Sequence, residues 1–135
     1  MSTRSNIGVM EPDGTCHVIY CHFDGYESHH APILRNYSEA DARALIALGS
    51  ISQLAERVAP REGESHSYRS PVDGVVVAYH RDRGEDLYPA RVCTKETACQ
   101  EEYVYLFDVA RGVWTWRAER SNEWTDLAPF VGEAI

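Results

Sequence analysis

Two arginines that follow a β-branched run are the side chains in this sequence best suited to binding an anion. Arg81 and Arg83 come directly after the apolar segment 75–79. Guanidinium groups hold phosphate or carboxylate oxygens through paired hydrogen bonds, and in an extended backbone these two arginines share one side. The acidic neighbours are Asp82, Glu85 and Asp86. A local ion-pair network that neutralises the arginines is therefore the competing interpretation, and both stay open here.

Aromatic side chains offer the second part of a ligand site. A base stacked on an aromatic ring gains about 1–3 kcal/mol, and Tyr26 and Trp114 are the rings that we expect to do this. At alternating strand positions the same residue types usually form the core, which is the alternative. Arg4, near the start of the chain, is a further cation that can bind a phosphate. The predicted ligand-binding residues are Arg4, Tyr26, Arg81, Arg83 and Trp114.

Cysteines and histidines raise the question of a metal site. The cysteines are Cys16, Cys21, Cys93 and Cys99, and the first two each precede a histidine. Their spacing differs from that of common zinc modules. Cys16 and Cys21 also point to opposite faces of a strand, because their separation is odd. We therefore expect no metal and no cofactor, with the cysteines present as reduced thiols.

The sequence carries no motif typical of catalysis. It has no nucleophile elbow, no glycine-rich phosphate loop and no paired histidines on a helix. Adjacent acids such as Glu85-Asp86 tend to diverge and do not flank one substrate bond. A protein without catalytic residues is the favoured prediction. A hydrolase that uses His22 and His80 as acid and base is a weaker alternative.

Net charge limits the partners of the chain. Its 135 residues include 13 basic and 21 acidic ones, for a net charge of −8, and 44% are apolar. The field of such a protein repels phosphate, which excludes indiscriminate nucleic-acid binding. No apolar run reaches the roughly 18–20 residues of a membrane span, and no signal stretch is seen, so we expect a cytoplasmic protein. The charge is unevenly distributed along the chain. Residues 61–92 contain five arginines, whereas residues 93–135 carry a net charge of −4.

Caps and periodicity predict the helices that would support such a site. Helical segments are expected at 28–36, 38–48 and 51–54. The clearest one begins at Ser38, which forms an approximate capping box with Asp41, and it ends at Gly49. In the first segment Pro32 is tolerable only within the first turn.

Alternating and β-branched runs predict the strands. Strands are expected at 5–10, 16–23, 75–79, 88–93, 103–107 and 113–116. Turn residues at 11–14 and 110–112 close two hairpins, and Pro89 marks an edge strand. The order of elements predicts an α+β fold, in which a mostly antiparallel sheet of about five to six strands packs on one or two helices.

The remaining segments are predicted to be connections within a single domain, 1–135. Residues 58–71 have almost no apolar content and form a surface loop, and residues 94–101 form a turn or a short helix. Four apolar side chains of the tail can dock on the sheet: Trp124, Leu127, Phe130 and Val131. An exposed edge strand and a hairpin with two tryptophans suit a homo-oligomer, and a monomer is equally compatible.

Several motifs together resemble a widespread family of small proteins from phages, prophages and plasmids. They are TRSNI at 3–7, IYCHFDGY at 19–26, LIALG with IS at 45–52, YHRDRGE at 79–85 and EEYVYLF at 101–107. The resemblance covers nearly the whole chain, although the 58–71 loop departs from the pattern and the tail after Arg117 follows it loosely. Small phage proteins of this kind are often anti-defence factors, which implies a role in binding and not in catalysis.

Two functions follow as expectations. The first is a non-enzymatic protein that sequesters a small nucleotide-type immune signal, such as the cyclic ADP-ribose signals of Thoeris defence. The second is an anti-CRISPR protein whose acidic surface blocks a Cas effector, for which the charge of residues 93–135 is the supporting feature. The expected partner is thus a small ligand or a host defence protein, with no direct contact to nucleic acid or membrane.

Overall fold

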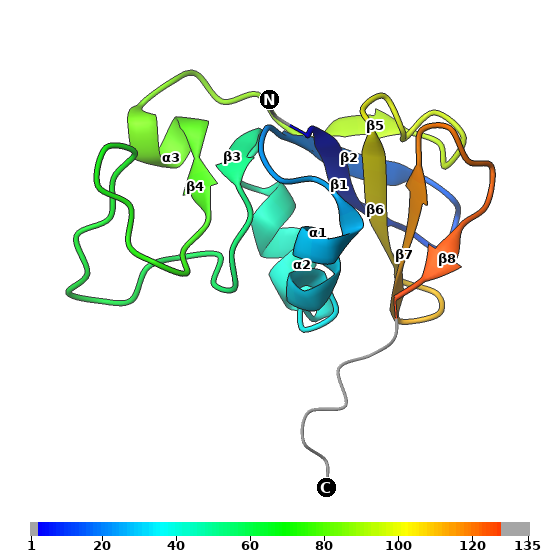
Figure 1. Ribbon diagram of the computed structural model, residues 1–135, viewed down its shortest axis with the longest axis horizontal. Helices are drawn as coiled ribbons and strands as arrows, with labels where there is room; N and C mark the ends of the chain where they lie inside the picture. The colour runs from blue at the N-terminus through cyan, green and yellow to red at the C-terminus, as the bar shows by residue number, and fades with distance from the viewer. Residues whose placement is uncertain (1–2, 128–135) are drawn as a thin grey trace, which may run out of the picture.

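One mixed sheet of eight strands organises the molecule. The computed structural model describes residues 3–127. The strands run in the order β4-β3-β2-β1-β6-β7-β8, and β5 lies beside β2 (Figure 1). They are β1 (Ser5–Met10), β2 (Cys16–Cys21), β3 (Ile51–Gln53), β4 (Val77–Ala78), β5 (Arg91–Cys93), β6 (Tyr103–Asp108), β7 (Val113–Ala118) and β8 (Thr125–Asp126). Neighbouring strands are antiparallel except in the pairs β1–β6 and β2–β3. The predicted α+β class is confirmed.

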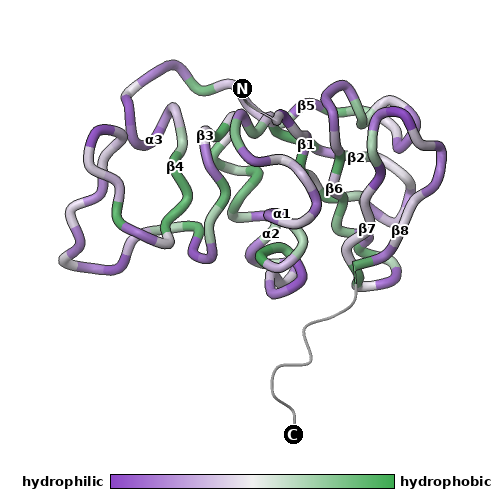
Figure 2. Tube along the Cα trace, in the orientation of Figure 1, coloured by the Kyte–Doolittle hydropathy of each residue, from purple (hydrophilic) through white to green (hydrophobic). Residues whose placement is uncertain are grey.

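Helices α1 (Glu27–Leu34) and α2 (Glu39–Ile46) cover one face of this sheet. The predicted start of α2 is confirmed, because the Asp41 amide donates to Ser38 Oγ and the Ser38 amide donates to the Asp41 carboxylate. Buried side chains of both helices pack on Ile7 of β1 and Tyr105 of β6. Figure 2 shows the hydrophobic residues concentrated on the strands and the hydrophilic ones on the connecting loops. Most of the apolar core therefore lies between the sheet and these two helices.

A second, smaller core covers the opposite face. Val18 of β2 and Leu106 of β6 contribute to it, together with Cys16 and Ala98. The segment 94–101 carries Ala98 over the sheet through turns, as predicted. Trp124 also packs against this cluster, whereas Leu127 joins the main core. The predicted docking of Phe130 and Val131 lies outside the described residues.

Several local predictions were wrong, and at residues 51–53 strand pairing overrode the local signal. Residues 51–53 form β3 and not a helical turn, since Ile51 pairs with both Cys21 and Ala78. The predicted strand 75–79 is shorter, and a helix, α3 (Tyr79–Arg83), follows it at once. Pro32 lies in the second turn of α1, where the short helix loses only one hydrogen bond.

No helix in residues 3–127 has the length and apolar character that a bilayer crossing requires. The loop 58–71 contains neither helix nor strand, and polar contacts hold it against the rest of the molecule. Arg57 pairs with Glu64, and His66 of the loop contacts Asp82 of α3. This loop and α3 together form the end of the molecule beyond β4 (Figure 1).

Candidate functional site

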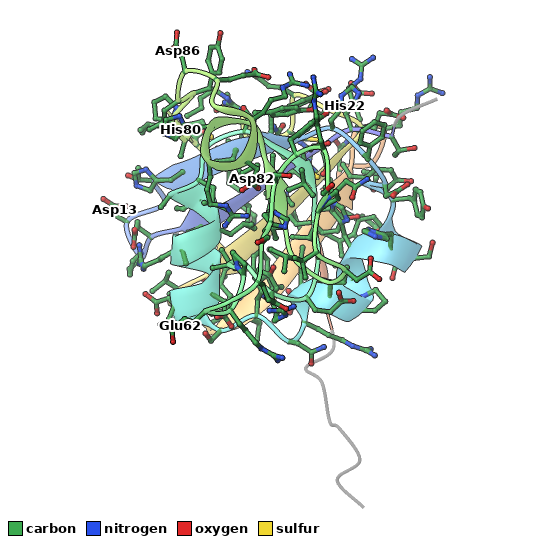
Figure 3. All side chains as sticks on the ribbon, turned by 90° about the vertical axis from the view of Figure 1, so that its left-hand side faces the viewer. Asp13, His22, Glu62, His80, Asp82 and Asp86 are labelled. Atoms are coloured by element: carbon green, nitrogen blue, oxygen red, sulfur yellow. The ribbon has the colours of Figure 1, made fainter. Side chains whose placement is uncertain are left out.

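A buried carboxylate anchors the 58–71 loop to α3. Asp82 Oδ2 accepts hydrogen bonds from the Ala78 amide (2.8 Å) and from His66 Nε2 (3.1 Å), and both side chains of the His66–Asp82 pair are almost fully buried. The Val72 amide donates to His66 Nδ1, so Nε2 carries the proton that is donated to Asp82. Burial alone would raise the pKa of Asp82, but the hydrogen bonds from Arg81 and the Ala78 amide outweigh it and lower the pKa. Asp82 is thus the structural centre of this region (Figure 3).

Arg81 belongs to the same network and is not available to a ligand. Its Nε donates to Asp82 Oδ1 (2.8 Å), and its terminal nitrogens donate to the carbonyl oxygens of Val58 (2.7 Å) and Val76 (2.6 Å). The prediction that Arg81 and Arg83 act as one clamp is wrong, because α3 replaces the extended backbone that it assumed. The ion-pair interpretation describes Arg81 correctly.

Arg83 has a different environment. Its guanidinium carbon lies 4.4 Å from the centroid of the Tyr68 ring and 5.0 Å from that of Tyr79, so two aromatic faces fix its position. The Arg83 side chain is 45% exposed, and it forms an ion pair with Glu85. Contacts of this kind hold a guanidinium in place while leaving it open to solvent.

A hollow of about 390 Å³ lies beside Arg83. Its lining residues are Ser67, Tyr68, Arg69, Asp82 and Arg83. Arg69 is exposed, and no carboxylate among residues 3–127 forms an ion pair with it. The volume falls in the range of small-molecule sites, which is roughly 300–1,000 Å³. The site therefore offers two cations and an aromatic wall on a loop that Asp82 holds in place.

The other predicted ligand residues do not line this hollow. Trp114 is 3% exposed, and its indole nitrogen donates to the Tyr37 carbonyl oxygen, so it is a core residue and its prediction as a stacking ring is wrong. Tyr26 is exposed at the start of α1, where its hydroxyl donates to Asp24. Arg4 is exposed at the start of β1, and its amide donates to Glu102. Only Arg83 of the five predicted residues belongs to the candidate site.

Tyr68, Arg69 and Tyr79 were not predicted as ligand residues. The polar composition of the loop 58–71 predicted a surface connection. A tyrosine next to an arginine in an otherwise non-aromatic loop was the available signal. This pair can be recognised as part of a site only from the contact between the loop and α3, where the ring centroids of Tyr68 and Tyr79 lie 6.0 Å apart.

The histidines named as acid and base have structural partners. The Tyr20 hydroxyl and His22 Nδ1 are 2.6 Å apart, and His80 Nδ1 donates to the Glu85 carbonyl oxygen (2.6 Å). His22 and His80 both lie toward the upper edge of the view in Figure 3, and neither lines the hollow. Within residues 3–127, no three histidine, cysteine, aspartate or glutamate side chains are grouped in a way that would hold a metal ion.

A second hollow, of about 480 Å³, lies between α2 and the segment before β5. Its walls are mostly apolar, with Ile46, Leu87 and Pro89 among them. The cation there, Arg43, is held by both carboxylate oxygens of Glu11. The α3 site, whose Arg69 forms no ion pair among residues 3–127, therefore suits an anionic ligand better than this hollow, whose arginine is already paired.

Comparison with protein-family models, with curated proteins and with solved structures found no match to this chain. The geometry of the α3 site is thus the basis for assigning it a function.

Proposed function

We propose that this protein binds a small nucleotide-type ligand at the α3 site and retains it without chemical change. The observation that carries the proposal is the pair of solvent-exposed arginines, Arg69 and Arg83, on the wall of one hollow. Two guanidinium groups in such a position can bind a phosphate or pyrophosphate through charge-assisted hydrogen bonds. Tyr68 supplies an aromatic wall beside them, which suits the base of the same ligand.

The site is local, which reconciles it with the acidity of the protein. A net charge of −8 opposes phosphate at long range. At contact distance the nearest charges determine how strongly a phosphate is attracted, because salt screens exposed charges beyond about 8–10 Å. Such a site favours a discrete ligand that enters the hollow over a polyanion that covers the surface.

The resemblance to small phage and plasmid proteins supports an anti-defence role for this binding. In that role the ligand is an immune signal of the cyclic ADP-ribose or cyclic nucleotide class, and sequestering it suffices to block the response. A host-cell cytoplasmic location belongs to the same proposal.

Isothermal titration calorimetry with cyclic AMP, cyclic GMP, ADP-ribose and cyclic ADP-ribose tests the proposal. We expect at least one of these probes to bind. Arg83→Gln and Arg69→Gln should each weaken that binding at least tenfold, because each removes a charge-assisted hydrogen bond worth about 1.5–3 kcal/mol. Arg120→Gln, at an exposed arginine of another surface, is the matched control and should bind as the unchanged protein does.

A variant with the opposite effect sharpens the test. The Glu85 carboxylate pairs with Arg83, and a bound phosphate would compete with it for the guanidinium. Glu85→Gln should therefore bind the same probe more tightly, by up to about tenfold. Absence of heat with all four probes would refute the proposal, and co-elution with a purified Cas effector would then favour the anti-CRISPR alternative.

A further inference from the structure

Two cysteines face each other across neighbouring strands. In the antiparallel pair β2–β5, Cys16 lies directly opposite Cys93. Directly opposed residues point to the same face of a sheet, and both side chains belong to the small core on the face away from α1 and α2. Both are free thiols in this structure. The register therefore brings together two cysteines that are 77 positions apart in the sequence.

The geometry of such a pair suits a disulfide. Opposed residues of antiparallel strands have Cα atoms about 4.5–5.5 Å apart. A disulfide requires Cα atoms about 4.4–6.8 Å apart, so the backbone does not have to move. Cys99 packs at the edge of the same core, but it lies outside the strands and is not in register with Cys16. Cys16 and Cys93 are thus the matched pair.

The two thiols differ in exposure. Cys16 is fully buried, and burial, together with the neighbouring Cys93, raises the pKa of its thiol to about 11. The charged groups that act on it are Lys95, Glu96 and Asp108. Cys93 lies on the short strand β5 and is partly exposed. A solvent-borne oxidant therefore reaches Cys93 first. The register places Cys16 beside the oxidised sulfur, although the raised pKa of Cys16 slows its attack.

We propose that Cys93 is a peroxide-sensitive thiol and that Cys16 resolves it into a reversible disulfide between β2 and β5. In the first step the Cys93 sulfur attacks hydrogen peroxide, the O–O bond breaks, and a sulfenic acid and water form. In the second step the Cys16 sulfur attacks the Cys93 sulfur, the S–O bond breaks, and the oxygen leaves as water with the thiol proton. Two thiols lose two electrons in total, which reduce one peroxide to two waters. A dithiol reverses the reaction by exchange.

The disulfide would tie down a weakly held part of the fold. β5 has three residues and pairs only with β2 among the described strands. β5 is the last part of the segment that leads from α3 back to the sheet (Figure 1). A covalent link that closes so long a loop restricts the unfolded chain and stabilises the folded one. Because the pair does not line the hollow at α3, this proposal is independent of ligand binding.

Peroxide titration followed by peptide mapping tests the proposal. After treatment with stoichiometric hydrogen peroxide, we expect loss of two of the four thiols, a cross-linked peptide that joins Cys16 to Cys93, and a melting temperature raised by at least about 5 °C. Dithiothreitol should reverse all three changes. Cys99→Ser is the matched control and should form the same cross-link.

Cys93→Ser should abolish the cross-link, and its partly exposed position allows the variant to fold. Cys16→Ala should instead leave Cys93 as a sulfenic or sulfinic acid, which mass spectrometry identifies. The proposal is overturned if peroxide links Cys93 to Cys99, joins two chains, or oxidises Cys93 further without any Cys16–Cys93 peptide.

Discussion

Replacing Asp82 by alanine should lower the free energy of unfolding by about 3–5 kcal/mol, which is the typical cost of removing one partner from a buried ion pair. The carboxylate is 3% exposed and satisfies His66, Arg81 and the Ala78 amide at once. Its removal leaves these donors without their acceptor in a region that water reaches poorly. The packing of the 58–71 loop on α3 should loosen, because the buried His66–Asp82 bond is lost while the Tyr68 amide can still donate to the carbonyl oxygen of residue 82.

Urea denaturation of Asp82→Ala measures the first effect, and limited proteolysis measures the second. Cleavage within 58–71 should become faster, whereas the β1–β2 hairpin should stay protected. Asp86→Ala, at an exposed carboxylate four residues away, is the matched control and should change stability by less than about 0.5 kcal/mol. A loss below 1 kcal/mol in Asp82→Ala would show that Arg81 and His66 find other partners.

Acidification from pH 7 to pH 4.5 should cost about 2–3 kcal/mol of stability through one histidine. His30 is fully buried in α1 and is hydrogen-bonded to Ser5 Oγ (3.1 Å) and to His29 Nδ1 (3.0 Å). The Tyr105 ring lies 5.1 Å away between centroids. Burial, with a smaller effect of His29, lowers the pKa of His30 from 6.5 to about 3.

The sign of this effect follows from where the proton binds. Below pH 6.5 the unfolded chain takes up a proton at His30, and the folded protein does not until the pH approaches 3. Stability is therefore complete above about pH 6.5 and falls as the pH drops toward 3. Carboxylates with a lowered pKa, such as those of Asp82 and Glu11, add their own loss only at lower pH, as the pH drops below about 4.5.

Urea denaturation at several pH values measures this dependence within each protein. His30→Gln keeps a hydrogen-bonding group near Ser5 and removes the titration, so its stability should change by less than about 1 kcal/mol between pH 7 and pH 5. His17→Gln, outside the His30 network, is the control and should retain the dependence of the unchanged protein. A steep acid-side loss that persists in His30→Gln would assign the effect to other groups.

Local signals predicted the parts of the fold that local contacts form. The Ser38–Asp41 capping box and the turns of the two hairpins act within a few residues, so their structures follow from the sequence. The strand β3 was missed because its pairing with β2 and β4 is a tertiary contact. The parallel pair β1–β6 has no local signal, since the sequence of neither strand specifies the strand with which it pairs.

Only part of the candidate site follows from the sequence, because tertiary contacts bring its other residues together. The segment that follows the buried strand lines the candidate hollow, and the predicted ligand residue Arg83 is part of that lining. Arg81 could not be distinguished from Arg83 by sequence. Only the structure shows that Arg81, on helix α3, reaches the carbonyl oxygens of residues 58 and 76. The loop residues Tyr68 and Arg69 enter the site through the Asp82 network, which depends on a contact between segments 16 positions apart.

The parallel pair β1–β6 has a consequence for how the protein is made. Residues 5–10 pair with residues 103–108, which are 98 positions later in the chain. At synthesis rates of about 5–20 residues per second, the nascent β1–β2 hairpin waits roughly 5–20 s for its second partner. During that time one edge of β1 is unpaired, which makes the nascent chain a substrate for chaperones. The sheet closes only after residues 103–108 have been made, and high contact order of this kind slows folding.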